Sequence, residues 1–358
     1  MQTTLTVLHN VVSTILEVGK RLVFRIIKVT FVIGLVLGIA LIATSYFYLK
    51  NVYEQEISVG DDVVYFEIEP GFTARKVLNE LEKVGVVKSA EHAYLASRIF
   101  TDISQLHAGV YSLPESTSLA SLWRMFSNGE QHLFSITFAE GLNFKEWREI
   151  IAQHPWLELE WDGLSAQEVA RQLELPFSAG HPEGLLHPNT YRFHAYTSDA
   201  EIYRQAAQQM ETILEELWQN RQEGLPIQSP YEALILASIV EKETGADGER
   251  SLVASVFVNR LNRGMRLQSD PTIIYGLGER YRGVIYRSDI QEHTAYNTYR
   301  INRLPPTPIA MPGRAALEAT LNPPQTDYYY FVSRNDGTHV FSKSLIEHNR
   351  AVQQYQRN

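Results

Sequence analysis

Apolar and polar residues follow one repeated pattern over much of the first half of the chain. Three times a short alternating strand is followed by a turn and an amphipathic helix, in VVYFEIEPGFTARKVLNELEKVGVV, AGVYSLPESTSLASLWRMFSNGE and FSITFAEGLNFKEWREIIAQ. Helix caps are predicted at Thr73 and at Ser116 or Ser118, and Gly129 is predicted to end the second helix. The repetition suggests one small strand-helix unit used three times.

From about residue 165 the apolar spacing predicts longer helices. One lies near 200–222, and two others are YEALILASIVEKET after Pro230 and SLVASVFVNRLNRG ending at Gly264. Asp270 is predicted to cap PTIIYGLG, with Pro271 as its first helical residue. The segment DYYYFVSRNDGTHVFS predicts a β-hairpin, and SLIEHNRAVQQY a final helix. The predicted class is α+β, with strands at both ends of a helical middle.

The 21 residues Val29–Leu49 carry no charge, and a helix of this length can cross a hydrocarbon core of ~30 Å. The run ends in Tyr46-Phe47-Tyr48 rather than in a small-residue cleavage site, so it predicts a retained transmembrane helix. Basic residues precede the run and acidic residues follow it, which predicts a cytoplasmic N-terminus and an outer location for the remaining chain. Residues 3–27 are interpreted either as a helix on the inner leaflet or as a continuation of the anchor helix.

The amino-acid composition excludes several kinds of site and of ligand. The 358 residues include no cysteine, so a disulfide, a thiolate nucleophile and a Cys-type zinc site are excluded. Residues 1–50 have five Lys or Arg and one acid, and the rest has 27 Lys or Arg against 40 acids, an acidic body that argues against nucleic-acid binding. Without a zinc-type histidine pair, a serine elbow or a phosphate loop, we expect no metal and no cofactor.

Glu241 is the predicted catalytic residue. It continues the apolar stripe of Leu234 and Ala237 on its helix, and a carboxyl in apolar surroundings has the raised pKa of a general acid. Glu243 lies about 200° around the same helix and is expected in solvent. The spacing alone is equally compatible with a structural ion pair between Glu241 and an arginine such as Arg260.

Other polar residues stand among apolar, Gly or Pro neighbours and could line a glycan cleft, because sugars need amides and hydroxyls beside aromatic faces. Each could equally be a capped turn or a satisfied core hydrogen bond. These substrate-binding candidates are Glu183, Tyr191, Asn259, Gln268, Asp270, Tyr296 and Asn297.

The segments PEGLLHPNTYRF, ASIVEKET, VFVNRLNRGMRLQSDPTIIYGLG, AYNTY, LPPTPIAMPG and YYYFVSRNDGTHVFS together resemble the endolytic murein transglycosylase family (MltG, or YceG-like). The apolar run and the flanking charges predict a cytoplasmic segment over 1–28 and a transmembrane helix over 29–49. The resemblance implies a small LysM-like α/β subdomain and connection over 50–135 and a catalytic YceG-like domain over 136–358. It also implies that the first glutamate of EKET, Glu241, is catalytic.

The resemblance further implies a lyase of peptidoglycan glycan strands, on the periplasmic side of a bacterial inner membrane. Glu241 would protonate the oxygen of the MurNAc-β-1,4-GlcNAc bond and then accept the proton of the MurNAc C6 hydroxyl, leaving a 1,6-anhydro end. The implied role is to terminate nascent strands beside penicillin-binding proteins. Two alternatives stay open: a hydrolytic muramidase in which Glu183 or Asp270 activates water, and a non-catalytic, membrane-anchored glycan-binding scaffold.

Overall fold

The computed structural model describes residues 2–60, 63–175, 180–245 and 248–356. By its internal contacts the chain divides into two compact units, 1–132 and 133–358. Both mix helices and short strands, and the described strands form five two-stranded pairs. The predicted mixture of helix and strand is confirmed.

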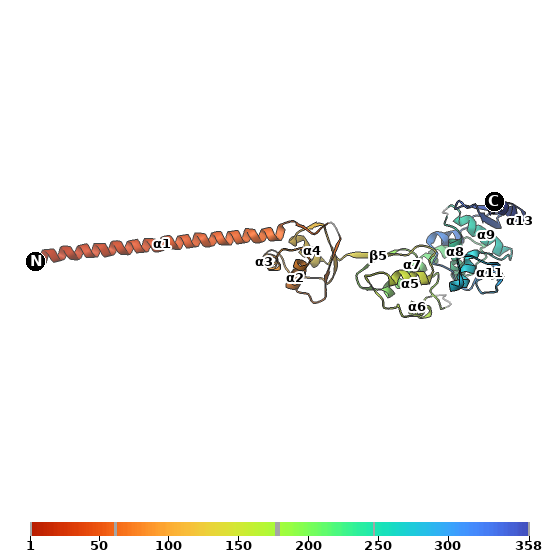
Figure 1. The fold of residues 1–358 in the computed structure, drawn as a ribbon, viewed down its shortest axis with the longest axis horizontal. Coiled ribbons are helices and arrows are strands. Elements are labelled where there is room, and N and C mark those ends of the chain that lie inside the picture. The colour runs from red at the N-terminus through yellow and green to blue at the C-terminus, as the bar shows by residue number, and fades with distance from the viewer. Residues whose placement is uncertain (1, 61–62, 176–179, 246–247, 357–358) are drawn as a thin grey trace. The chain divides into compact units, whose positions relative to one another are not determined.

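The first unit begins with one long helix, α1 (Gln2–Glu54), which runs without a break through the predicted anchor (Figure 1). Residues 3–27 therefore continue the anchor helix. The apolar side chains of residues 29–42 are exposed along α1, as expected of a helix that is long and apolar enough to cross a membrane.

The rest of the first unit is a small strand-helix-helix-strand fold. Its elements are β1 (Ile57–Ser58), β2 (Val64–Ile68), α2 (Ala74–Lys83), α3 (Ala90–Phe100), β3 (Gly109–Leu113), β4 (Ser116–Thr117) and α4 (Leu119–Asn128). Strands β2 and β3 are antiparallel, so the strands of the first two predicted repeats pair with each other. The caps at Thr73 and Ser118 and the left-handed Gly129 are confirmed, whereas α3 was not predicted.

The second unit starts with the third predicted repeat. Its first elements are β5 (Leu133–Thr137), α5 (Phe144–Ala152), β6 (Leu157–Glu158), α6 (Ala166–Gln172), β7 (Thr190–His194), β8 (Thr197–Ser198) and α7 (Asp199–Gln219). Strand β5 pairs antiparallel with β7, which contains Tyr191.

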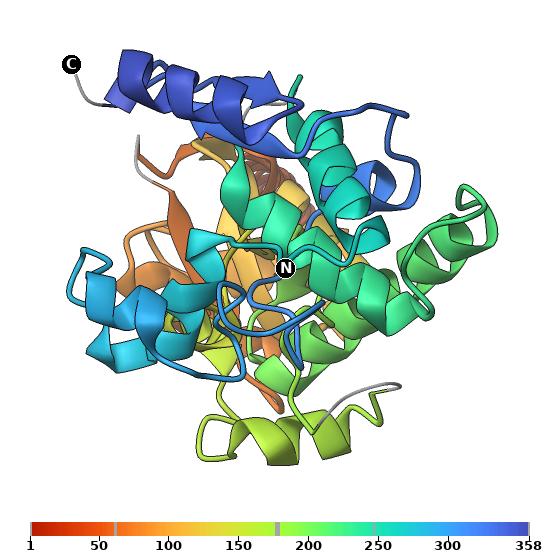
Figure 2. The same ribbon diagram turned by 90° about the vertical axis from the view of Figure 1, so that its right-hand side faces the viewer.

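Helices form the remainder of this unit: α8 (Pro230–Glu243), α9 (Arg250–Asn262), α10 (Asp270–Leu277), η1 (Gly278–Arg280), α11 (Arg287–Gln291) and α12 (Arg314–Leu321). The chain ends with the hairpin β9 (Tyr330–Ser333) and β10 (His339–Ser342) and with α13 (Leu345–Gln356), which packs against the hairpin (Figure 2). The predicted hairpin turn is confirmed, because Asn335 and Gly337 adopt positive φ.

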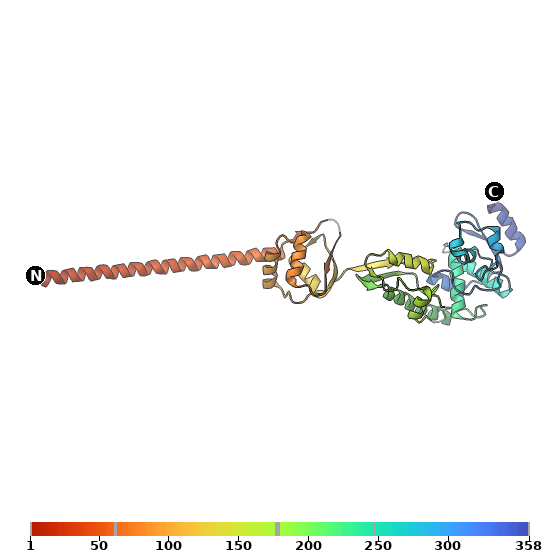
Figure 3. The ribbon, with the colours of Figure 1, turned by 60° about the horizontal axis from the view of Figure 1, so that its bottom comes forward.

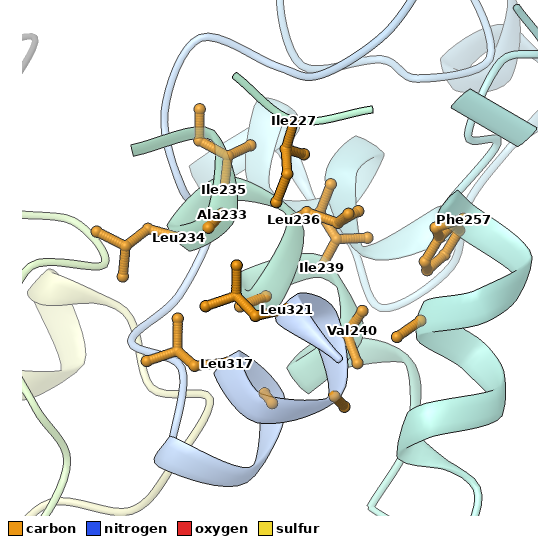
Figure 4. Packing of buried hydrophobic residues seen from close by; sticks show 14 of the residues in the cluster. Ile227, Ala233, Leu234, Ile235, Leu236, Ile239, Val240, Phe257, Leu317 and Leu321 are labelled. Atoms are coloured by element: carbon orange, nitrogen blue, oxygen red, sulfur yellow. The ribbon is translucent and has the colours of Figure 1, made fainter. Parts of the chain in front are cut away.

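Helix α8 is the centre of the second unit. Ser229 caps it and Pro230 occupies the first turn, where a missing N–H costs nothing. All eight residues from Ala233 to Val240 are buried, and α12 and α9 pack against the helix (Figure 4). A helix that is apolar on every side must be enclosed by its neighbours. The residues at the C-terminal end of α8 are therefore held in place by a tightly packed helix.

Candidate active site

Glu241 lies in the last turn of α8 and is held by two donors. The backbone N–H of Gly313 donates to Oε2 at 2.9 Å, and Nη2 of Arg250 lies 3.5 Å from Oε1. Burial raises the pKa of Glu241, while Gly313 and Arg250 oppose that rise. Both carboxyl oxygens are thus occupied by groups that favour the charged form.

A second carboxylate shares this ion pair. Nη2 of Arg250 is also 3.8 Å from Oε2 of Glu140, whose negative charge adds to the rise in the pKa of Glu241. Only 5% of the Glu241 side chain and 11% of the Arg250 side chain are exposed. The structure therefore contains the ion pair that the sequence allowed as an alternative, but the arginine beside Glu241 is Arg250 and not Arg260.

Arg260 serves a different purpose. Its guanidinium donates to the carbonyl oxygens of Tyr329 at 2.7 Å and Leu267 at 2.5 Å. These bonds tie α9 to the segment before the C-terminal hairpin and to the loop before α10. Arg260 nevertheless lies close enough to Glu243 to lower its pKa slightly.

Glu243, the last residue of α8, is not in solvent, and that expectation is wrong. Its carboxyl is partly buried, and Oε1 accepts a hydrogen bond of 2.5 Å from the Ser269 hydroxyl. Burial raises the pKa of Glu243 to about 7, against the opposing effect of that hydrogen bond. The negative end of the α8 dipole also disfavours a carboxylate there. Such a group can both give and take a proton near neutral pH.

Two of the predicted substrate-binding residues flank Ser269. Gln268 is exposed and has a φ of 50°, a left-handed conformation that is uncommon outside glycine. Asp270 is exposed and accepts a hydrogen bond of 2.7 Å from the Tyr299 hydroxyl. Ser269, rather than Asp270, is the residue before α10, and its hydroxyl is directed to Glu243 instead of capping the helix.

Buried threonines fix this short loop. The Ser269 N–H donates to the Thr298 hydroxyl at 2.9 Å, and the Thr298 and Thr272 hydroxyls are 2.8 Å apart. Because all three residues are buried, Ser269 has little freedom to move away from Glu243.

Glu183 lines a cavity of the second unit, and Tyr296 packs against Tyr275, another residue that lines it. A cavity of about 1050 Å³ is lined by α5, α10, Glu183 and Lys242, which stands between the two α8 glutamates. Glu183 is 2% exposed and accepts from the Phe144 N–H and the Tyr275 hydroxyl, and burial raises its pKa to about 8. Tyr296 packs on Tyr275 with ring centroids 4.9 Å apart.

The last three candidates have structural partners. The Asn259 amide donates to the carbonyl oxygens of Thr326 and Tyr328. The buried Asn297 amide donates to the carbonyl oxygens of residues 289, 290 and 292. The Tyr191 hydroxyl donates to the His187 carbonyl at 2.6 Å. The structure does not bring these three side chains together with Glu243.

The arrangement defines a class: a chain with one membrane-length helix and an α+β unit whose core helix ends in two carboxyls of raised pKa. The chain belongs to the YceG-like family, whose model matches residues 66–354. It is 30% identical to an endolytic murein transglycosylase of Bacillus subtilis strain 168, over 88% of this chain and 91% of that protein.

Two further similarities agree. An endolytic murein transglycosylase of Streptococcus pneumoniae strain D39 is 27% identical over 91% of this chain, which spans 65% of that longer protein. A crystal structure of a yceG-like protein from Listeria monocytogenes aligns with a TM-score of 0.53 and 29% identity, covering 81% of this chain and 99% of the other. The family predicted from the motifs is confirmed.

Proposed function

We propose that this protein is an endolytic lytic transglycosylase that cuts peptidoglycan glycan strands between MurNAc and GlcNAc. The name shared by its relatives supports the reaction. The observation that carries the proposal is the Glu243 carboxyl at the end of α8, which is partly buried and accepts a hydrogen bond from Ser269, with a pKa that burial raises to about 7.

Glu243 has stronger structural support than Glu241 as the acid and base. One hydroxyl, from Ser269, contacts the Glu243 carboxyl, and the exposed Gln268 and Asp270 stand on either side of that serine. Glu241, in contrast, has both oxygens directed to Arg250 and Gly313. A general acid must carry its proton at neutral pH, and the ion pair with Arg250 works against that.

The reaction needs only one carboxyl. Protonated Glu243 gives its proton to the glycosidic oxygen, the C1–O bond of MurNAc breaks, and the GlcNAc hydroxyl leaves. The MurNAc C6 hydroxyl then attacks C1, and its proton passes to the Glu243 carboxylate. A 1,6-anhydro ring forms, no water is consumed, and the enzyme returns to its starting state. Gln268, Asp270 and Tyr299 would position the two sugars, whereas Glu183 and Tyr296 would shape the neighbouring cavity.

We infer the location of the protein from α1. The helix would anchor the protein in a bacterial inner membrane with residues 1–28 in the cytoplasm and the two folded units in the periplasm. The strand-helix-helix-strand fold of β2, α2, α3 and β3 would be a LysM-like glycan-binding module. Cleavage in the periplasm, close to the membrane, would terminate nascent glycan strands beside penicillin-binding proteins.

The products distinguish this reaction from hydrolysis. Mass spectrometry of digested glycan should detect ends lighter by one water molecule than ordinary reducing ends. Full-water reducing ends would instead favour the muramidase alternative. Asp270 would then be the first candidate to activate water, because it is exposed and close enough to Glu243 to raise its pKa.

The rate of glycan cleavage should fall with pH on the alkaline side only. Since the first step needs protonated Glu243, cleavage should be constant below pH 7 and fall about tenfold per unit above it. Initial rates measured on folded protein between about pH 5 and 9 test this. A second limb that falls toward acid would indicate a separate carboxylate base, as in a hydrolase.

A further inference from the structure

The apolar part of α1 runs directly into contact with α3. The Tyr46 and Phe100 rings are 5.5 Å apart, and the Tyr48 hydroxyl is 3.0 Å from Nδ1 of His92. One turn later, Leu49, Val52 and Tyr53 pack against the core of the same unit. The last residues of the predicted membrane span are therefore already part of the folded unit.

Helix α3 runs across α1 rather than along it. The Phe100 ring contacts both Tyr46 and Tyr53, which are two turns apart on α1. Along the axis of α1, the ring therefore lies about midway between these two tyrosines. His92 lies eight residues earlier on α3, yet it contacts Tyr48, at almost the same level. Figures 1 and 3 show α3 at the end of the small fold where α1 enters.

The length of the apolar run sets where the bilayer surface must lie. Residues 29–45, before the first contact with α3, span only about 25 Å at ~1.5 Å per residue. The hydrocarbon core is ~30 Å thick. Shifting the helix outward to make up the difference would bury Lys28 and then Arg25, which is costly. The outer boundary therefore reaches Tyr46–Tyr48, the level at which α3 is attached.

Helix α3 has the side chains for such a position. Leu95 and Ile99, one turn apart, are 45% and 55% exposed, and Arg98 between them is also exposed. Two apolar side chains beside a cation suit the boundary between acyl chains and anionic headgroups. We propose that α3 is an interfacial helix whose Leu95 and Ile99 insert into the outer surface of the bilayer. This rests on the proposed anchoring by α1.

The test uses the full chain, which has no cysteine of its own. Single variants Leu95→Cys and Ile99→Cys carry a nitroxide label in vesicles of phosphatidylethanolamine and phosphatidylglycerol. Val36→Cys, within the apolar run, is the control for the anchor. Val63→Cys, at an apolar position that is 65% exposed and outside α3, is the control for an ordinary surface site. Accessibility to oxygen, which concentrates in lipid, is compared with accessibility to a water-soluble nickel complex.

We expect the labels at 36, 95 and 99 to favour oxygen and the label at 63 to favour nickel, with nickel accessibility at 95 and 99 several-fold below that at 63. Water-like values at 95 and 99 with a lipid-like value at 36 would overturn the interfacial helix alone. A water-like value at 36 would overturn the anchor and with it this inference. Lipid-like values at all four positions would also overturn it, because the insertion would not be specific to α3.

Discussion

Glu243→Gln is expected to lower the rate of glycan cleavage by roughly 10²–10⁴-fold, the usual contribution of a general acid and base. The amide keeps the size of the carboxyl and can still accept the hydrogen bond from Ser269, but it has no proton to give at neutral pH. Thermal unfolding should change little, because Glu243 is already half protonated near pH 7. Release of soluble fragments from purified glycan strands measures the effect.

Glu241→Gln is the matched comparison, two residues away on the same helix. We expect it to retain far more activity than Glu243→Gln, and Glu201→Gln, at an exposed carboxylate, to behave as wild type. Loss of cleavage in Glu241→Gln with normal activity in Glu243→Gln would restore the assignment that the motif implies. If neither substitution changed cleavage, neither carboxyl would be the acid. Glycan binding by an inactive Glu243→Gln variant would separate catalysis from a scaffold role.

Arg250→Met is expected to lower the free energy of unfolding by about 3 kcal/mol near pH 8, which is roughly 6–12 °C in Tm for a unit of this size. The substitution leaves Glu241 buried beside Glu140 without its cation. The pKa of Glu241 is already raised by burial and should rise further. Loss of Arg250 destabilises the charged form of Glu241, so the deficit should be small at low pH and grow as pH increases through the folded-state pKa of Glu241, which lies above 4.5.

The double variant Arg250→Met/Glu241→Gln tests the cause. With no charge at 241, most of the lost stability should return, and the pH dependence of the deficit should become weaker. Calorimetric unfolding of wild type, both single variants and the double variant completes the cycle. A double variant as unstable as Arg250→Met alone would mean that Arg250 acts through other contacts and that the ion pair with Glu241 is unimportant.

Helix α8 explains why the helical wheel misjudged Glu243. The wheel assumes one buried and one solvated face, so it placed Glu241 inside and Glu243 outside. The run from Ala233 to Val240 has no polar face, and the only polar residue in it, Ser238, donates to the Ile235 carbonyl. This continuous apolar run is the feature of the sequence from which a helix enclosed on all sides could have been predicted. For such a helix, residue spacing cannot rank the carboxyls at its end.

Long-range contacts also decide which of the predicted substrate-binding residues lie near the end of α8 and which do not. Gln268 and Asp270 are the chain neighbours of Ser269, which contacts Glu243 because the loop before α10 folds back over the end of α8. Asn259 and Asn297 have amide side chains like that of Gln268, but their amides donate to backbone carbonyl groups. Residue type predicts the capacity for a hydrogen bond and not the identity of the partner.

Features that depend on neighbours along the chain could be predicted from the residue order alone: the membrane-length helix, the strand-helix units, the caps at Thr73 and Ser118, and the hairpin turn at Asn335–Gly337. Tertiary packing decided which carboxyl is paired with Arg250 and which one faces Ser269. A pKa depends on burial and on charges brought together from distant parts of the chain, and no local pattern contains those distances.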